Sequence, residues 1–213
     1  VADELRKLLG ARQPSRGRAI AERTGILGTI LPERHPAGSW LVRVDRAARS
    51  VRLAALLVPL ARAEADPRHL DRPSAHRVVV VCRNLKLSNL EAELAAQLVG
   101  AWPAVREPVW TKPELRRLLA ELDRDKRAPA SELWATVAPE LADAARAVLG
   151  DPLGAADLAV TGKDVMAALA ITPGPAVGRI LALLLDRVLD DPSVNSREHL
   201  LQLAQQLELE VGR

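Results

Sequence analysis

The chain has 213 residues, 48% of them apolar and 27% charged, which excludes a disordered, collagenous or disulfide-stapled protein. Phe and Tyr are absent, so the core must be aliphatic, and this favours an all-α fold. The same absence excludes RRM and OB domains, which stack unpaired bases on aromatic rings. The single cysteine, Cys82, fits a reducing, cytoplasmic setting, and the sequence predicts no signal peptide and no membrane span.

Basic residues concentrate at the N-terminal end. Residues 1–60 contain 11 Lys or Arg against 5 Asp or Glu, a balance of +6, and residues 61–213 contain 19 against 22, a balance of −3. Arginines recur at every third position after residue 42, which predicts one basic side of a helix: Arg43, Arg46, Arg49 and Arg52. An anionic partner such as RNA is one interpretation, and a solvated arginine-rich face is the other.

In chain order, we predict a helical segment over 1–40, a helical body over 41–150 and a helical tail over 151–213. Pro and Gly clusters predict loops at 32–38, 66–73, 102–113 and 150–154. Three capping boxes predict helix starts, namely Ser88 with Glu91, Thr111 with Glu114, and Thr161 with Asp164. The β-like run Val78 to Cys82 is predicted as a buried helix, because a helix start follows it.

The usual signatures of catalysis are missing from the sequence. No G-x-G-x-x-G, P-loop or H-E-x-x-H motif occurs, and the four histidines are scattered. Asp123 and Asp125 form an Asp-x-Asp pair, but no Gly-Ser precedes them, and we interpret them as a solvated helix end. We therefore predict no catalytic residue, metal ligand or cofactor in this chain.

The tail contains a helix-turn-helix pattern around Pro173-Gly174-Pro175. We expect Gly174 to adopt a positive φ in the turn and Pro175 to occupy the first helical position. The free amides at that helix start, and those near Gly162-Lys163, can meet a phosphate. A plain helical hairpin with nothing bound is the alternative.

Two stretches carry the motifs of a known family. In the tail they are Gly162-Lys163-Asp164, Pro173-Gly174-Pro175, Gly178 and Asn195-Ser196-Arg197-Glu198. At the N-terminal end they are Asp3-Glu4-Leu5, Pro14, Glu22-x-Thr24-Gly25-Ile26-Leu27 and Ile30-Leu31-Pro32-Glu33. In this order they resemble the RNA-binding body and tail of bacterial class II tRNA nucleotidyltransferases, the CCA-adding enzymes and their poly(A) polymerase relatives.

The resemblance implies a division of labour. The family's catalytic head and neck would precede Val1, and the first residue being Val instead of Met leads us to expect a longer parent protein. Mg²⁺ and ATP or CTP are expected only with that head, in the same chain or in a partner chain. The body and tail of the family support tRNA and position its 3′ end, so tRNA or another RNA is the expected partner.

The middle of the chain departs from the family. Leu53 to Leu57 and Arg83 to Asn89 resemble the flanks of an HD-type helical domain, but Val58-Pro59 stands where the metal-binding His-Asp pair would be. We interpret this part as a degenerate HD-like scaffold. A residual HD phosphohydrolase is therefore the least favoured function.

The sequence thus predicts an all-α RNA-binding protein without a catalytic site. The candidate RNA-binding residues are Arg12, Arg16, Arg18, Gly162, Lys163, Gly174 and Arg179. The main alternative is a freestanding helical interaction protein derived from the same family, with no RNA role. Neither the product of the parent enzyme nor the oligomeric state can be deduced from the sequence.

Overall fold

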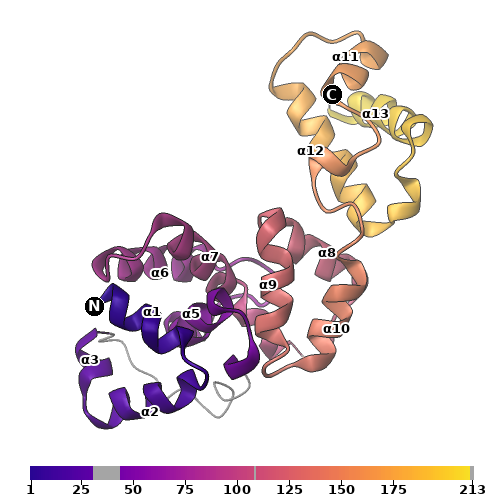
Figure 1. The fold of residues 1–213 in the computed structure, drawn as a ribbon. Coiled ribbons are helices and arrows are strands. Elements are labelled where there is room, and N and C mark those ends of the chain that lie inside the picture. The colour runs from indigo at the N-terminus through magenta and orange to yellow at the C-terminus, as the bar shows by residue number, and fades with distance from the viewer. Residues whose placement is uncertain (31–43, 108, 212–213) are drawn as a thin grey trace.

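The computed structural model describes residues 1–30, 44–107 and 109–211, and this part contains α-helices and 3-10 helices (η) and no β-strand (Figure 1). The predicted all-α fold is confirmed. The larger lobe contains α1 (Ala2–Gly10), α2 (Pro14–Arg23), α3 (Ile26–Ile30), η1 (Val44–Arg46), α5 (Arg49–Leu57), η2 (Val58–Leu60), α6 (Arg72–Asn84), α7 (Asn89–Gly100), η3 (Trp102–Arg106), α8 (Lys112–Ala120), α9 (Arg124–Trp134) and α10 (Pro139–Val148). The smaller lobe contains η4 (Ala155–Asp157), α11 (Gly162–Leu169), α12 (Pro175–Asp190), η5 (Pro192–Val194) and α13 (Arg197–Val211).

The three predicted helix starts are confirmed. In each box the hydroxyl accepts a hydrogen bond from the N3 amide, and the N3 carboxylate accepts one from the cap amide, at the starts of α7, α8 and α11. The run Val78 to Cys82 lies inside α6, with Val78 and Cys82 fully buried, so the helical prediction there is also correct. These features follow from short-range chemistry that tertiary packing leaves intact.

The predicted basic helix face after residue 42 is wrong in part. Arg46 ends η1, and Ala48 has an extended backbone (ψ 151°), so α5 begins only at Arg49. Arg46 therefore belongs to a different element from Arg49 and Arg52. Arg43, the predicted loop 32–38 and the boundary near residue 40 lie outside the described residues.

The core of the larger lobe is centred on α5, which packs against α7 and α9. Val51, Ala54 and Ala55 are fully buried, and their small size lets the helix axes approach closely. Leu5 and Leu9 join the same core from α1. Trp134 is fully buried, and its indole N–H donates a hydrogen bond to the Ala101 carbonyl oxygen at 3.2 Å.

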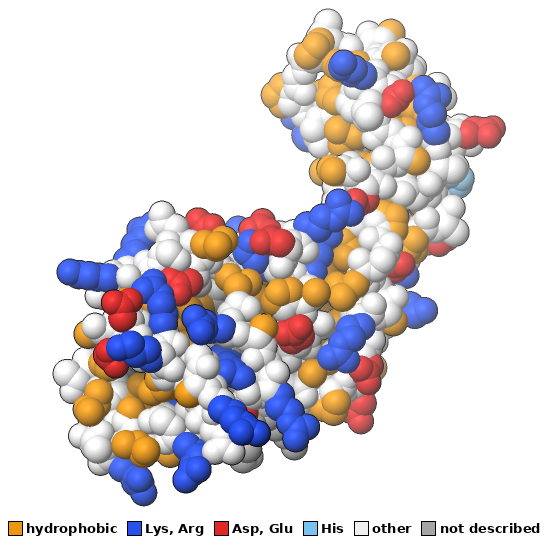
Figure 2. Space-filling model, viewed as in Figure 1, with side chains coloured by type: hydrophobic (Ala, Val, Ile, Leu, Met, Phe, Trp, Pro, Cys, Tyr) orange, Lys and Arg blue, Asp and Glu red, His pale blue; other side chains and the backbone are white. Residues whose placement is uncertain are grey.

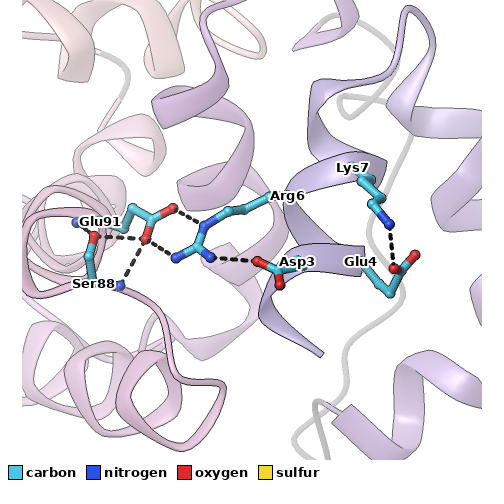
Figure 3. A network of polar contacts seen from close by, with 6 residues as sticks. All are labelled: Asp3, Glu4, Arg6, Lys7, Ser88 and Glu91. Carbon is cyan, nitrogen blue, oxygen red and sulfur yellow. Dashed lines mark hydrogen bonds and ion pairs between the residues drawn. The ribbon is translucent and has the colours of Figure 1, made fainter.

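Helix α1 is also tied to α7 by a charged contact. The Arg6 guanidinium donates to both carboxylate oxygens of Glu91, at 3.0 and 2.8 Å, while the Ser88 hydroxyl donates to the same carboxylate (Figure 3). The hydrogen bond from Arg6 is the main cause that lowers the pKa of Glu91 to about 2. This bidentate pair fixes the first helix on the lobe.

The smaller lobe has its own hydrophobic core, formed by residues of α11, α12 and α13 and of the segment between η4 and α11. Its buried members are Leu158, Val160, Val165, Ile180, Leu184, Val188, Leu200, Ala204 and Leu207. At Gly162 the first turn of α11 lies close to α12, since a Cβ atom at this position would be 3.3 Å from Cγ1 of Val177, a tight contact.

Two arginines of α8 hold the lobes together; we refer to Arg116, Arg117 and their partners as the interlobe joint. Arg116 is only 8% exposed, and it donates to Asp151 at 2.6 Å and to the carbonyl oxygens of Leu189 and Asp190, each at 3.2 Å. Cations are favourable at the C-terminal end of a helix, where carbonyl groups lack partners. Arg117 adds ion pairs to Asp186 and Asp190, at 3.0 and 2.8 Å.

The turn between α11 and α12 differs from its prediction. Gly174 has φ 171°, which is extended backbone that any residue adopts, so the expected positive φ is wrong. The left-handed residue is Ala170, with φ 53°, which ends α11 and reverses the chain before the Pro-Gly-Pro sequence begins. Pro175 occupies the first position of α12, as predicted.

Candidate nucleic-acid interface

The predicted site residues fall into two groups that lie at opposite ends of the molecule. Arg12, Arg16 and Arg18 belong to the α1–α2 region of the larger lobe, and the others belong to the starts of α11 and α12 in the smaller lobe (Figure 1). The structure does not gather them at one place. Any ligand that contacts both groups must therefore extend along the molecule.

Only two of the three N-terminal arginines are available at the surface. Arg12 and Arg16 are exposed, and Arg16 donates to the Gln13 side chain at 3.3 Å. Arg18 is 9% exposed and pairs with Glu22 at 3.3 Å on the inner side of α2. Its burial removes Arg18 from the set of residues that can meet a phosphate.

Exposed arginines without a carboxylate partner are concentrated in this region. Within the described residues, those between positions 12 and 49 are Arg12, Arg16, Arg23, Arg46 and Arg49. Elsewhere in the larger lobe many arginines are paired with acids, as are Arg62, Arg68, Arg116, Arg117, Arg124 and Arg146. In Figure 2, Lys and Arg side chains stand out over the part of the larger lobe that holds α1 and α2.

The start of α11 already holds an anion. The Asp164 carboxylate accepts hydrogen bonds from the backbone and hydroxyl of Thr161, at 2.8 and 2.6 Å, and pairs with Arg197 of α13 at 2.8 Å. The bonds from Thr161, followed by that from Arg197, hold the pKa of Asp164 well below its usual range. A phosphate at these amides would meet this negative charge, so only the exposed side chain of Lys163 remains as a candidate contact.

The start of α12 also has few backbone amides free to bind a phosphate. Gly174 makes no side-chain cap, Pro175 has no N–H, and the Val177 amide donates to the Gly174 carbonyl oxygen at 3.1 Å. Gly174 and Arg179 are both exposed. Arg179 is thus the candidate contact on α12, through its guanidinium and not through the helix start.

Some important residues were not among the seven predicted RNA contacts. Arg46 and Arg49 gain their position only because α5 packs beside the end of α1, where a Cβ on Gly10 would lie 2.6 Å from the Arg49 guanidinium. Arg116 is buried between the two lobes. Its position directly after Leu115, inside an apolar helical stripe, is the one local signal that could have indicated burial.

The position where an HD-type domain would have its metal-binding His-Asp pair is occupied by Val58 and Pro59. Val58 and Pro59 lie in η2, where Val58 is buried in the core of the larger lobe. In the described part of the chain, no three His, Cys, Asp or Glu side chains come together in a way that could hold a metal ion. The same residues contain no helix long and apolar enough to cross a membrane.

One comparison with known proteins gives a match. Residues 153–204 match the family model described as tRNA nucleotidyltransferase domain 2, which links this part of the chain to that family. The matched range covers most of the smaller lobe and its hydrophobic core. Neither a curated protein nor a solved structure matches the chain.

Proposed function

We propose that the chain is the RNA-binding portion of a protein of the tRNA nucleotidyltransferase or poly(A) polymerase family. It binds RNA through the phosphates of the RNA backbone and positions the 3′ end for a catalytic head. This head is located elsewhere in the protein or in a partner chain. The observation that carries this proposal is the set of exposed arginines without carboxylate partners around the α1–α2 turn. The same chain contains the matched range 153–204.

The chemistry of these arginines suits a phosphate backbone. A guanidinium presents a planar fork of N–H donors that matches two phosphate oxygens, and it keeps its charge at any physiological pH. Arg12 and Arg46 are not engaged by acids in the described structure, so binding RNA would break no ion pair at either residue. Contacts of this kind hold and orient RNA, and they read no base sequence.

The interlobe joint is consistent with one RNA molecule binding to both lobes. Arg116 and Arg117 attach α12 to α8, so Lys163 and Arg179 are carried on a lobe that is fixed to the larger one. An extended RNA that contacts both lobes would then be held in a single register. This arrangement suits positioning of the 3′ end better than two independently moving lobes would.

The proposal places the chemistry of nucleotide addition outside this chain. Nucleotidyl transfer uses carboxylates that hold two metal ions, and the described residues do not form such a group. Mg²⁺ and ATP or CTP are accordingly assigned to the head. The protein is proposed to act in the cytoplasm on tRNA or a related RNA.

The test is a tRNA titration of the full 213-residue chain at two salt concentrations. The affinity should fall steeply with salt, because each phosphate contact releases condensed cations from the RNA. Lys163→Gln or Arg179→Gln should each weaken binding by roughly 1 kcal/mol. Lys112→Gln removes an exposed lysine of the larger lobe and serves as the control. Weak binding that is insensitive to salt and to these charges would refute the proposal.

One observation favours a second function, a helical protein-interaction module. An apolar groove of about 200 Å³ lies between α1, α5 and α7, and Leu90 at its edge is 68% exposed. Exposed apolar grooves are common at sites where proteins dock. The same titration separates the two functions, since an interaction module without an RNA role leaves tRNA unbound at low salt.

A further inference from the structure

A cleft of about 1030 Å³ lies between the α1–α2 turn on one side and η1 and α5 on the other. Its lining residues are Gly10, Ala11, Arg12, Gln13, Asp45, Arg46 and Arg52. Three of these seven are arginines and one is an acid, although the three arginines come from three different elements or turns. Folding therefore collects positive charge here from parts of the chain that are far apart in the sequence.

Arg52 forms the anchored side of the cleft. Its guanidinium donates to the carbonyl oxygens of Leu9 and Ala11, at 2.8 and 3.0 Å, and to that of Asp45. These bonds join the end of α1 to η1. Arg52 therefore fixes the relative positions of the end of α1, η1 and α5, which form the walls of the cleft.

Asp45, the one acid among the described lining residues, is bound to α2. Its carboxylate accepts from the backbone N–H and the hydroxyl of Ser15, at 3.0 and 2.6 Å. Ser15 follows Pro14 in the first turn of α2, where an anion satisfies free amides and the helix dipole. The carboxylate is thus bound to the first turn of α2, while Arg12 and Arg46 remain exposed without an acidic partner.

We propose that this cleft is a phosphate-binding site that holds the backbone of an RNA, with Arg12 and Arg46 as direct contacts and Arg52 as the side chain that joins the walls of the cleft. This inference rests on the proposed function and locates its main contact. The described lining residues include no aromatic side chain on which a base could stack, and their arginines suit recognition of phosphates. The site lies outside the matched range 153–204.

The decisive variant is Arg12→Gln combined with Arg46→Gln. Its control is Arg72→Gln combined with Arg83→Gln, which removes the same charge from two exposed arginines of α6. If each cleft arginine contacts one phosphate, the cleft variant should bind tRNA roughly 30-fold more weakly than the wild type. Its salt slope should flatten by about two units, and the control should change the affinity less than about threefold.

A second measurement distinguishes an RNA backbone from a small phosphate compound. The side-chain Nε–H signals of Arg12 and Arg46, assigned by NMR with the single variants, are followed during titration with tRNA and, separately, with inorganic phosphate. Binding of RNA should shift both signals at a far lower concentration than inorganic phosphate does. Shifts with phosphate but none with RNA would assign the cleft to a small phosphate ligand and overturn the inference.

The outcomes separate the two proposals. If tRNA binds the wild-type chain, and the cleft variant loses affinity while the control does not, the cleft is confirmed as the site. If tRNA binds but the cleft variant behaves as the control does, the cleft inference fails and the proposed function stands. If the wild-type chain binds no tRNA at low salt, both fail. Melting curves of each variant verify that the fold is intact.

Discussion

The arginines of the interlobe joint and those that line the cleft between the α1–α2 turn and η1 differ in their surroundings. Arg116 is buried, and every bond it makes in the described structure stays within the protein. Arg12 and Arg46 are exposed and have no acidic partner there. A high arginine content alone therefore indicates neither stability nor binding, and the partner of each guanidinium separates the arginines that stabilise the fold from those proposed to bind RNA.

Among the substitutions considered, we expect the largest loss of stability at Arg116. Arg116→Gln leaves Asp151 and the last carbonyls of α12 without their donor, and should lower the free energy of unfolding by about 3 kcal/mol. Denaturant unfolding measures the loss, and small-angle scattering should show a larger radius of gyration as the lobes separate. Arg124→Gln is the control, because that ion-paired side chain is 80% exposed and should cost less than about 1 kcal/mol. Equal effects of the two changes would contradict the structural role of Arg116.

How far the sequence predicts this fold depends on the range of the interactions involved. The capping boxes at Ser88, Thr111 and Thr161 were predictable, since donor and acceptor lie three residues apart. The burial of Arg18 and of Arg116 was not, because each depends on packing between elements distant in the chain. The same reason explains the cleft, which needs α1 and α5 side by side.

The expected positive φ at Gly174 failed for a different reason. A Pro-Gly-Pro sequence is typical of a tight turn, but the chain reverses four residues earlier, at Ala170. The Pro-Gly-Pro sequence correctly predicted a turn, but the residue with positive φ is Ala170 and not Gly174. The helix boundaries on either side are less affected, because Pro175 can occupy only the first turn of α12.

We expect an intermediate effect on stability at the ion pair between Arg6 and Glu91. Arg6 is a paired arginine, in contrast to the exposed Arg12 nearby in the sequence. The folded-state pKa of Glu91, about 2, lies below its value of about 4.3 in an unfolded chain. The pair therefore stabilises the fold fully above about pH 4.3, and this stability is lost as the pH falls toward 2. Because the pair is partly solvated, the contribution is about 1 kcal/mol.

This pH dependence is measured by denaturant unfolding between pH 7 and pH 2. Arg6→Gln should lower the stability above about pH 4.3, and its difference from the wild type should shrink at lower pH as Glu91 becomes protonated in both proteins. A constant difference over the whole range would show that Arg6 stabilises the fold by packing and not by its charge.

The smallest effect on stability is expected at Gly174, the exposed residue that precedes α12. Gly174→Val should change the free energy of unfolding by less than about 0.5 kcal/mol, because φ 171° suits a β-branched residue and the position is exposed. Gly25→Val is the comparison, since Gly25 has φ 75° and a valine there should cost about 1–3 kcal/mol. Thermal unfolding of both variants checks this, and a large loss at Gly174 would contradict the extended backbone.

The most direct test of the central claim, that the unpaired arginines bind RNA phosphates, is the slope of log affinity against log salt for tRNA. The wild-type chain is compared with Arg12→Gln combined with Arg16→Gln, two exposed changes that should leave the melting temperature unaltered. We predict a steep slope for the wild type, and a slope for the variant that is flatter by about one unit for each phosphate it no longer binds. Identical slopes for the two proteins would contradict the claim.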